Sequence, residues 1–185
     1  MREDARAIAE LIDHAGEGIP SLLWESAAQP GETALDVGER RAARTGVTFC
    51  YENAVVGESN GGVICMLLGY PIDNTDPGDL SDVPEIVHPP IRLECKAPGT
   101  WYINAIAVRP AHRGRGLGKQ LLAIADACAI EAGRTATSLI VAESNTGARH
   151  LYERAGFRVV ASEPIVAHPR LPMRGQWLLM TRPVP

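Results

Sequence analysis

The hydrophobic pattern of the first part of the chain is helical. From Arg2 to His14 apolar residues recur at spacings of three and four, which predicts a helix that ends at Gly16. The same criterion indicates further helices around Ser21–Ala28 and Leu35–Thr45. The chain is therefore expected to begin with several short helices.

The pattern changes to that of strands after these helices. The runs VTFCYENAVVGES and GVICMLLGY are rich in β-forming residues, and Asn60-Gly61-Gly62 between them supplies the positive-φ residues of a tight hairpin. Residues 71–100 follow as a long connection rich in Pro and Gly, with room for a short helix. The connection carries an acidic run made of Asp73, Asp76, Asp79, Asp82 and Glu85.

Strands and helices alternate through the rest of the chain. Trp101–Val108 is apolar on both faces apart from Asn104, as expected of a central strand. A helix that Gly133 closes, the strand TSLIVA, a short helix that Gly156 closes, and the strands FRVVAS and QWLLMT complete the order. With no repeats and no evident linker, this predicts one mixed α/β domain over residues 1–185.

Composition and charge limit the possible partners. The 185 residues are 45% hydrophobic, which suffices for one core, and the net charge of −4 argues against general affinity for nucleic acid or anionic membranes. No stretch approaches the ~20 apolar residues of a membrane span, so we expect a cytoplasmic protein. The scattered cysteines are expected to be free thiols and to bind no metal; they are Cys50, Cys65, Cys95 and Cys128.

One turn is nevertheless strongly cationic. The segment AVRPAHRGRGLGKQLL (Ala107–Leu122) joins a strand to a helix through glycines and arginines, an arrangement that binds anions through backbone N–H groups and the helix dipole. A Walker loop requires glycine where Arg113 stands, and a dinucleotide fingerprint requires glycine where Lys119 stands. Both of these phosphate loops are therefore excluded.

The pattern that remains is R-x-x-G-x-G, at Arg113, Gly116 and Gly118. It is followed by N-x-x-A-x-x-L-Y-E-x-x-G-F between Asn145 and Phe157. In both motifs the chain resembles the GNAT superfamily of acyl-CoA-dependent N-acyltransferases. The resemblance implies a central mixed, mostly antiparallel sheet flanked by helices and splayed between its fourth and fifth strands. Members usually open with a short strand, so either that strand is missing here or the true start lies upstream.

The resemblance implies acetyl-CoA as the donor, held without a metal. Backbone amides from Arg113 to Gly118 would hold the pyrophosphate, and the main chain of Ile106 and Val108 would pair with pantetheine and the acyl carbonyl. The alternative is a solvated basic turn that caps a helix. The implied cofactor-binding residues are Ile106, Ala107, Val108, Arg113, Gly114, Arg115, Gly116, Leu117, Gly118, Lys119 and Asn145.

The resemblance also suggests catalytic residues. Tyr152 would protonate the leaving thiolate, since a phenol is protonated at neutral pH; alternatively it packs in the core. Asn145 suits a helix N-cap as well as a cofactor contact. The glutamate that serves as general base in some members is replaced by Ile140 here. Glu143 at the strand end is our candidate base, and its rivals are Glu94 and His150.

With this resemblance, the sequence predicts an N-acetyltransferase that transfers acetyl from acetyl-CoA to a primary amine by direct attack in a ternary complex. The alternative is a catalytically silent acyl-CoA-binding sensor or interaction module of the same fold. The acceptor is expected to be a small-molecule or peptide amine, which the sequence does not identify further. The sequence is also compatible with a homodimer. Asn104 faces either the acceptor or a neighbouring loop, and the acidic run either attracts a cationic acceptor or is simply solvated.

Overall fold

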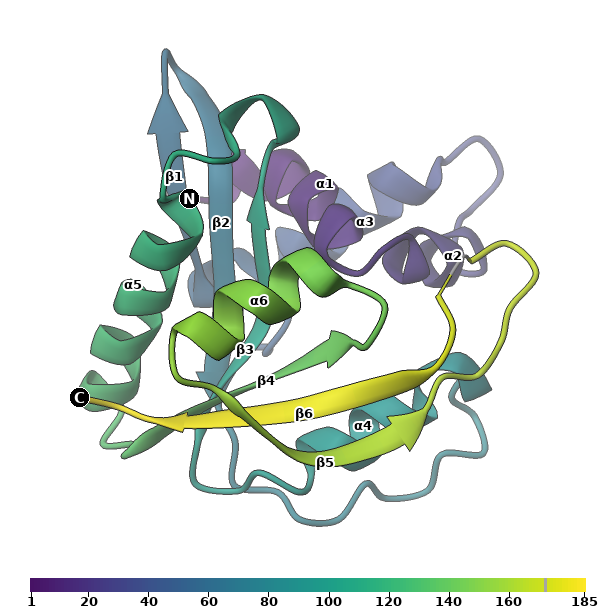
Figure 1. Ribbon diagram of the computed structural model, residues 1–185. Helices are drawn as coiled ribbons and strands as arrows, with labels where there is room; N and C mark the ends of the chain where they lie inside the picture. Colours follow the sequence, from purple (N-terminus) through teal and green to yellow (C-terminus); the bar gives the residue numbers. More distant parts are fainter. Residues whose placement is uncertain (172) are drawn as a thin grey trace. The chain divides into compact units, whose positions relative to one another are not determined.

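The computed structural model describes residues 1–171 and 173–185 and contains both helices and strands (Figure 1). The α-helices are α1 (Ala5–Ala15), α2 (Ile19–Glu25), α3 (Ala34–Ala42), α4 (His88–Glu94), α5 (Leu117–Glu131) and α6 (Thr146–Arg154). The strands are β1 (Ala54–Ser59), β2 (Gly62–Pro71), β3 (Trp101–Val108), β4 (Ala136–Ala142), β5 (Arg158–Pro164) and β6 (Gln176–Pro183). Short 3₁₀ helices span Arg2–Asp4, Tyr51–Asn53, Glu85–Val87 and Pro110–His112.

The strands form a six-stranded sheet in the order β1-β2-β3-β4-β6-β5. The pairs β1–β2, β4–β6 and β5–β6 are antiparallel, whereas β3 and β4 run parallel. The parallel register begins at Trp101↔Thr137 and ends at Ile103↔Leu139, which is the expected splay. This confirms the predicted fold class. Because Arg2–Asp4 form a 3₁₀ helix rather than a strand, the splayed pair is the third and fourth strand of this chain.

Contacts between Cα atoms divide the chain into two compact units. The first holds residues 1–69 and 105–121, and the second holds residues 70–104 and 122–185. The three boundaries fall inside β2, β3 and α5 rather than in a linker, where domain boundaries are expected. The single domain over residues 1–185 remains a prediction.

The helices of the first unit pack closely, with α3 against both α1 and α2. One face of α1 is buried, including Ile8 and Ile12, as the helical periodicity predicts. Gly38 of α3 lies against the Trp24 ring of α2: a Cβ added at Gly38 would be 2.4 Å from Trp24 Cζ3. Glycine at this position is therefore what allows α2 and α3 to approach.

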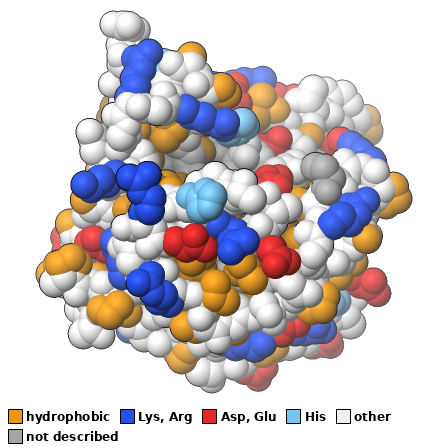
Figure 2. Space-filling view, in the orientation of Figure 1, with side chains coloured by type: hydrophobic (Ala, Val, Ile, Leu, Met, Phe, Trp, Pro, Cys, Tyr) orange, Lys and Arg blue, Asp and Glu red, His pale blue; other side chains and the backbone are white. Residues whose placement is uncertain are grey.

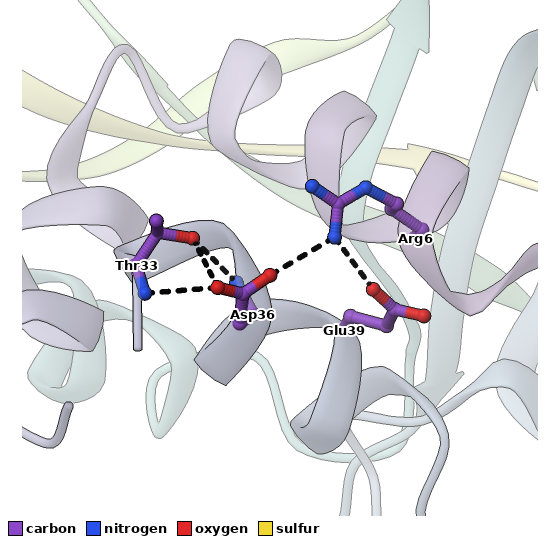
Figure 3. Close-up of polar contacts among 4 residues, drawn as sticks. All are labelled: Arg6, Thr33, Asp36 and Glu39. Carbon is purple, nitrogen blue, oxygen red and sulfur yellow. Dashed lines mark hydrogen bonds and ion pairs between the residues drawn. The ribbon is translucent and has the colours of Figure 1, made fainter. Parts of the chain in front are cut away.

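A polar network on the surface links α1 to the start of α3 (Figure 3). Thr33 caps α3, and Asp36 accepts bonds from the Thr33 backbone N–H at 2.9 Å and from its hydroxyl at 2.6 Å. Arg6 donates to Asp36 at 3.1 Å and to Glu39 at 2.8 Å. These bonds lower the pKa of Asp36 to about 2, and those from Thr33 contribute most.

The hairpin forms where the sequence predicts it, but its first strand is shorter. Asn60 and Gly61 take φ values of 52° and 75°, as a tight turn requires. Residues 47–53, expected to belong to the strand, instead form a loop and a 3₁₀ helix. The Asn53 side chain explains this difference, because it donates to Val47 O at 3.1 Å and Thr48 O at 2.9 Å and offers the backbone a local alternative to a strand.

The second unit contains β4, β6 and β5 with helices on the sheet. Helix α4, the short helix anticipated in the long connection, packs against all three strands. Phe157, the residue before β5, is fully buried, and the guanidinium of Arg182 lies 4.7 Å from its ring centroid. Arg182 also forms a 2.5 Å ion pair with Asp126. Through Arg182, β6 is thus held by a cation–π contact to Phe157 and by an ion pair to Asp126 of α5.

Three further expectations concern cysteines, metals and membranes. All four cysteines are free thiols, as predicted, and Cys50 and Cys65 are buried. Among the described residues, no group of three or more His, Cys, Asp and Glu side chains is arranged to hold a metal ion. Within the same residues, no helix is both long and apolar enough to cross a bilayer.

Candidate functional site

The glycine-arginine turn lies in the first unit, between the end of β3 and the start of α5. Gly114 and Gly116 have φ values of 73° and 80°, a conformation that disfavours residues with a side chain. No atom lies within 4 Å of a Cβ built at either glycine. The turn therefore needs glycine for its backbone conformation and leaves open space above it. Helix α5, 15 residues long, begins at the next residue, Leu117, so its positive dipole end faces this space.

The cations of the turn have different surroundings. Arg113, Arg115 and Lys119 are exposed, and Figure 2 shows Lys and Arg side chains gathered over this part of the chain. Arg113 Nε donates to Val108 O at 3.2 Å, and its guanidinium contacts the His14 ring of α1. Arg115 donates to Ala111 O at 3.3 Å. None of these partners is a carboxylate, so the positive charge of both arginines stays exposed around the turn, as binding of an anion requires.

Arg109 has a structural role instead. Its Nε donates to Val63 O at 2.7 Å, and its guanidinium pairs with Glu10 of α1 at 2.7 Å. Its backbone N–H donates to Ile64 O at 2.8 Å. The side chain thus ties the start of the turn to β2 and α1, which the sequence could not reveal because Glu10 and Arg109 are far apart along the chain.

The implied pantetheine segment is the second half of β3, also in the first unit. Ala107 is buried, whereas Ile106 and Val108 are half-buried on the alternate face. The side chains are ordinary strand residues, so a role in binding would rest on their main-chain groups, as the resemblance implies.

The residues of the second motif lie in the second unit. Asn145 Oδ1 accepts from Ala148 N at 3.1 Å, which confirms that Asn145 is the N-cap of α6. Tyr152 is buried on the same helix, with its ring centroid 5.9 Å from that of Phe157. Burial raises the pKa of Tyr152 to about 12, so the phenol stays protonated well above neutral pH.

The candidate bases differ in burial. Glu143 follows β4 and is exposed; its backbone N–H donates to Gln176 O at 2.8 Å, and its carbonyl accepts from Arg149 at 3.3 Å. His150 is exposed on α6. Glu94, at the end of α4, is half-buried, and desolvation raises its pKa above the usual value.

A polar cluster around Glu94 was not recognised from the sequence. Asn104 Nδ2 donates to Tyr70 Oη at 3.3 Å, and the Tyr70 and Tyr102 rings meet edge to face at 5.7 Å. Burial raises the pKa of both phenols, and the nearby Glu94 carboxylate raises them further. Asn104, as the polar exception in an apolar strand, was the signal that pointed here. It bonds Tyr70 of β2, which belongs to a neighbouring strand rather than a loop. That Asn104 faces the acceptor stays a prediction.

The comparisons with known proteins agree on the family. The model of the Acetyltransferase (GNAT) family matches residues 22–157. A crystal structure of an acetyltransferase superposes with a TM-score of 0.68 at 25% identity, over 100% of this chain and 97% of that one. An N-acetyltransferase from Staphylococcus aureus Mu50 gives 0.65 at 20% identity, over 98% and 97%. The structure of yncA from Salmonella typhimurium with its cofactor acetyl-CoA gives 0.57 at 20% identity, over 100% and 91%.

No curated protein sequence matches the chain. The family match covers most of the chain and includes both motifs, and the sheet order and splay are those of the superposed structures. The chain belongs to the GNAT family of acetyltransferases.

Proposed function

We propose that this protein transfers an acetyl group from acetyl-CoA to a primary amine by direct attack in a ternary complex. The observation that carries the proposal is the turn before α5: two glycines at positive φ, open space above them and exposed cations at a helix N-terminus. Such a turn suits a pyrophosphate, which coenzyme A carries. The family match makes acetyl-CoA the first donor to test.

The donor would be held by two segments. Backbone N–H groups from Arg113 to Gly118 would bind the pyrophosphate, with Arg115 and Lys119 adding positive charge. Gly118 lies within the first turn of α5, where the backbone N–H groups have no intrahelical acceptor. The main chain of Ile106, Ala107 and Val108 would bind pantetheine and the acyl carbonyl. A further contact would come from Asn145.

The reaction forms a C–N bond and breaks the C–S bond of the thioester. The amine attacks as a free base, so its ammonium form must first lose a proton, for which we propose Glu143. The departing thiolate takes a proton from Tyr152, whose raised pKa keeps that proton available. A backbone N–H aimed at the acyl oxygen would stabilise the developing oxyanion. The acceptor would be a small-molecule or peptide amine, and free thiols fit a cytoplasmic location.

The test is a pair of measurements on the full chain. Calorimetric titration should show acetyl-CoA binding, and thiol release should follow when primary amines are added. Binding without release for every amine would point instead to an acyl-CoA sensor. Tighter binding of ATP or NAD than of acetyl-CoA would overturn the proposal.

A further inference from the structure

The two ends of the connection between β2 and β3 are hydrogen-bonded to each other, and its helix packs on the sheet. Ile72 N donates to Thr100 O at 3.0 Å, and Gly99 N donates to Ile72 O at 2.7 Å, so the two ends of the connection are paired. Between them lies α4, which packs against β4, β5 and β6. The connection is thus part of the second unit's packed structure, and the residues on α4 have fixed surroundings.

A small cavity lies beside the end of α4. It has a volume of about 130 Å³ and is lined by Ile72, Asn74, Pro77, Ile91, Glu94 and Cys95. By liquid volume this would hold roughly four water molecules, or one short alkylamine. Glu94 is the acidic group in a wall otherwise made of apolar and neutral side chains.

The carboxylate of Glu94 has no counter-charge within the described chain. Its one recorded polar partner is the Tyr70 hydroxyl, and no cation contributes to its pKa. Lys96, two residues further along the chain, pairs with Glu163 at 2.7 Å instead, and Arg134 binds Asp73 through two bonds of 2.6 and 2.8 Å. A partly desolvated carboxylate without a cation is unfavourable for stability, so a role in binding is a physical reason for its presence.

The groups next to Glu94 hold its carboxylate in place. The Tyr70 hydroxyl donates to the Glu94 carboxylate, and the Asn104 amide that donates to this hydroxyl at 3.3 Å fixes its position. The Tyr70 ring packs edge to face on the Tyr102 ring at 5.7 Å, which further fixes the hydroxyl. Asn104 is also the first residue of β3 beyond the last parallel pair with β4, so this cluster begins where the sheet opens.

From this juxtaposition we propose that the cavity beside Glu94 binds an ammonium group of the amine acceptor, with Glu94, held by the Tyr70 hydroxyl, as its counter-charge. This inference rests on the proposed function and names the part of the chain that selects the acceptor. The size of the cavity and its apolar wall of Ile72, Pro77 and Ile91 favour an ammonium on a short, unbranched alkyl arm.

The test is amine binding by the full chain, followed by NMR or calorimetry, with propylamine and 1,4-diaminobutane as probes. Wild type should bind at least one of these amines, and the neutral analogue 1-butanol should bind far more weakly. Glu94→Gln keeps the shape and removes the charge, and it should weaken amine binding at least tenfold. Glu94→Asp keeps the charge and should weaken it less. Glu131→Gln, an exposed charge removal on α5, is the matched control and should bind as wild type does.

Two results would overturn the inference: Glu94→Gln binding amines as wild type does, or neither amine binding wild type. Measuring thiol release distinguishes failure of the ammonium site from failure of the proposed acetyltransferase activity. If amines are acetylated and Glu94→Gln leaves their KM unchanged, the inference fails while the acetyltransferase stands. If amines bind through Glu94 but no thiol is ever released, the proposed activity fails while the ammonium site stands.

Discussion

The side-chain amide of Asn104 donates a hydrogen bond of 3.3 Å to the hydroxyl oxygen of Tyr70. This bond joins the middle of β3 to the end of β2 and accounts for the polar residue in an otherwise apolar strand. Removing the hydroxyl by Tyr70→Phe leaves a half-buried amide donor without that acceptor. The change also removes the polar partner of Glu94, so the free energy of unfolding should fall by about 1–3 kcal/mol in urea denaturation. Tyr51→Phe, in a 3₁₀ helix, should change it by only a few tenths. Equal effects of the two variants would contradict this account.

The glycines of the cationic turn should be needed for donor binding. At φ values of 73° and 80°, alanine at Gly114 and Gly116 would be strained by about 1–2 kcal/mol each. In the double variant Gly114→Ala/Gly116→Ala the turn should adopt a different backbone conformation. The Kd for acetyl-CoA should therefore rise at least tenfold in calorimetry. Gly46→Ala places the same strain at a φ of 67° away from the turn. It should lower stability without changing the Kd.

Tyr152→Phe should separate chemistry from binding. The phenylalanine keeps the buried ring against Phe157, so the fold and the Kd for acetyl-CoA should be preserved. Loss of a general acid should lower kcat roughly 100-fold or more in the thiol-release assay. If kcat stayed at the wild-type value, Tyr152 would be a packing residue only.

Asp36 should make stability depend on pH in acid. Its pKa is lowered from 3.8 to about 2, so its bonds to Thr33 and Arg6 stabilise the folded state above pH 3.8. That contribution to stability is lost as the pH falls through about 2, because the carboxyl of Asp36 is then protonated and no longer accepts the bonds from Thr33 and Arg6 as an anion. Asp36→Asn should therefore lower the Tm at pH 6, and the difference from wild type should vanish near pH 2. Glu85→Gln, at another exposed acidic residue, should leave the Tm at pH 6 close to that of wild type.

Gly38 should be intolerant of any side chain. Because an added Cβ would lie 2.4 Å from the Trp24 ring, Gly38→Ala must displace the buried ring or push α2 and α3 apart. We expect a loss of about 1–3 kcal/mol in the free energy of unfolding. At Gly147 of α6 no atom lies within 4 Å of the added Cβ, so alanine there should be neutral or stabilising. A stable Gly38→Ala protein would show that the two helices can separate without cost.

Features that depend on neighbouring residues could be predicted from the sequence. The hairpin at Asn60-Gly61, the turn at Gly114 and Gly116, and the Asn145 cap each follow from the conformations that short segments can adopt. The same local logic was insufficient at residues 47–53, where the Asn53 side chain competes with strand formation. Periodicity identified the order of elements, and with it the fold class, because each period matches one kind of buried face.

Contacts between distant segments were decided only by the tertiary structure. The turn and its chemistry were predicted because they occupy consecutive residues. The use of Arg109 to bind Glu10, and the position of Glu94 beside Tyr70 without a counter-charge, join residues that the sequence separates widely. Burial of a charge and the identity of its partner depend on which elements pack together, and a single sequence carries no direct record of that packing. The sequence by itself therefore determined how the donor is expected to be held, while the structure was needed to find a candidate site for the acceptor.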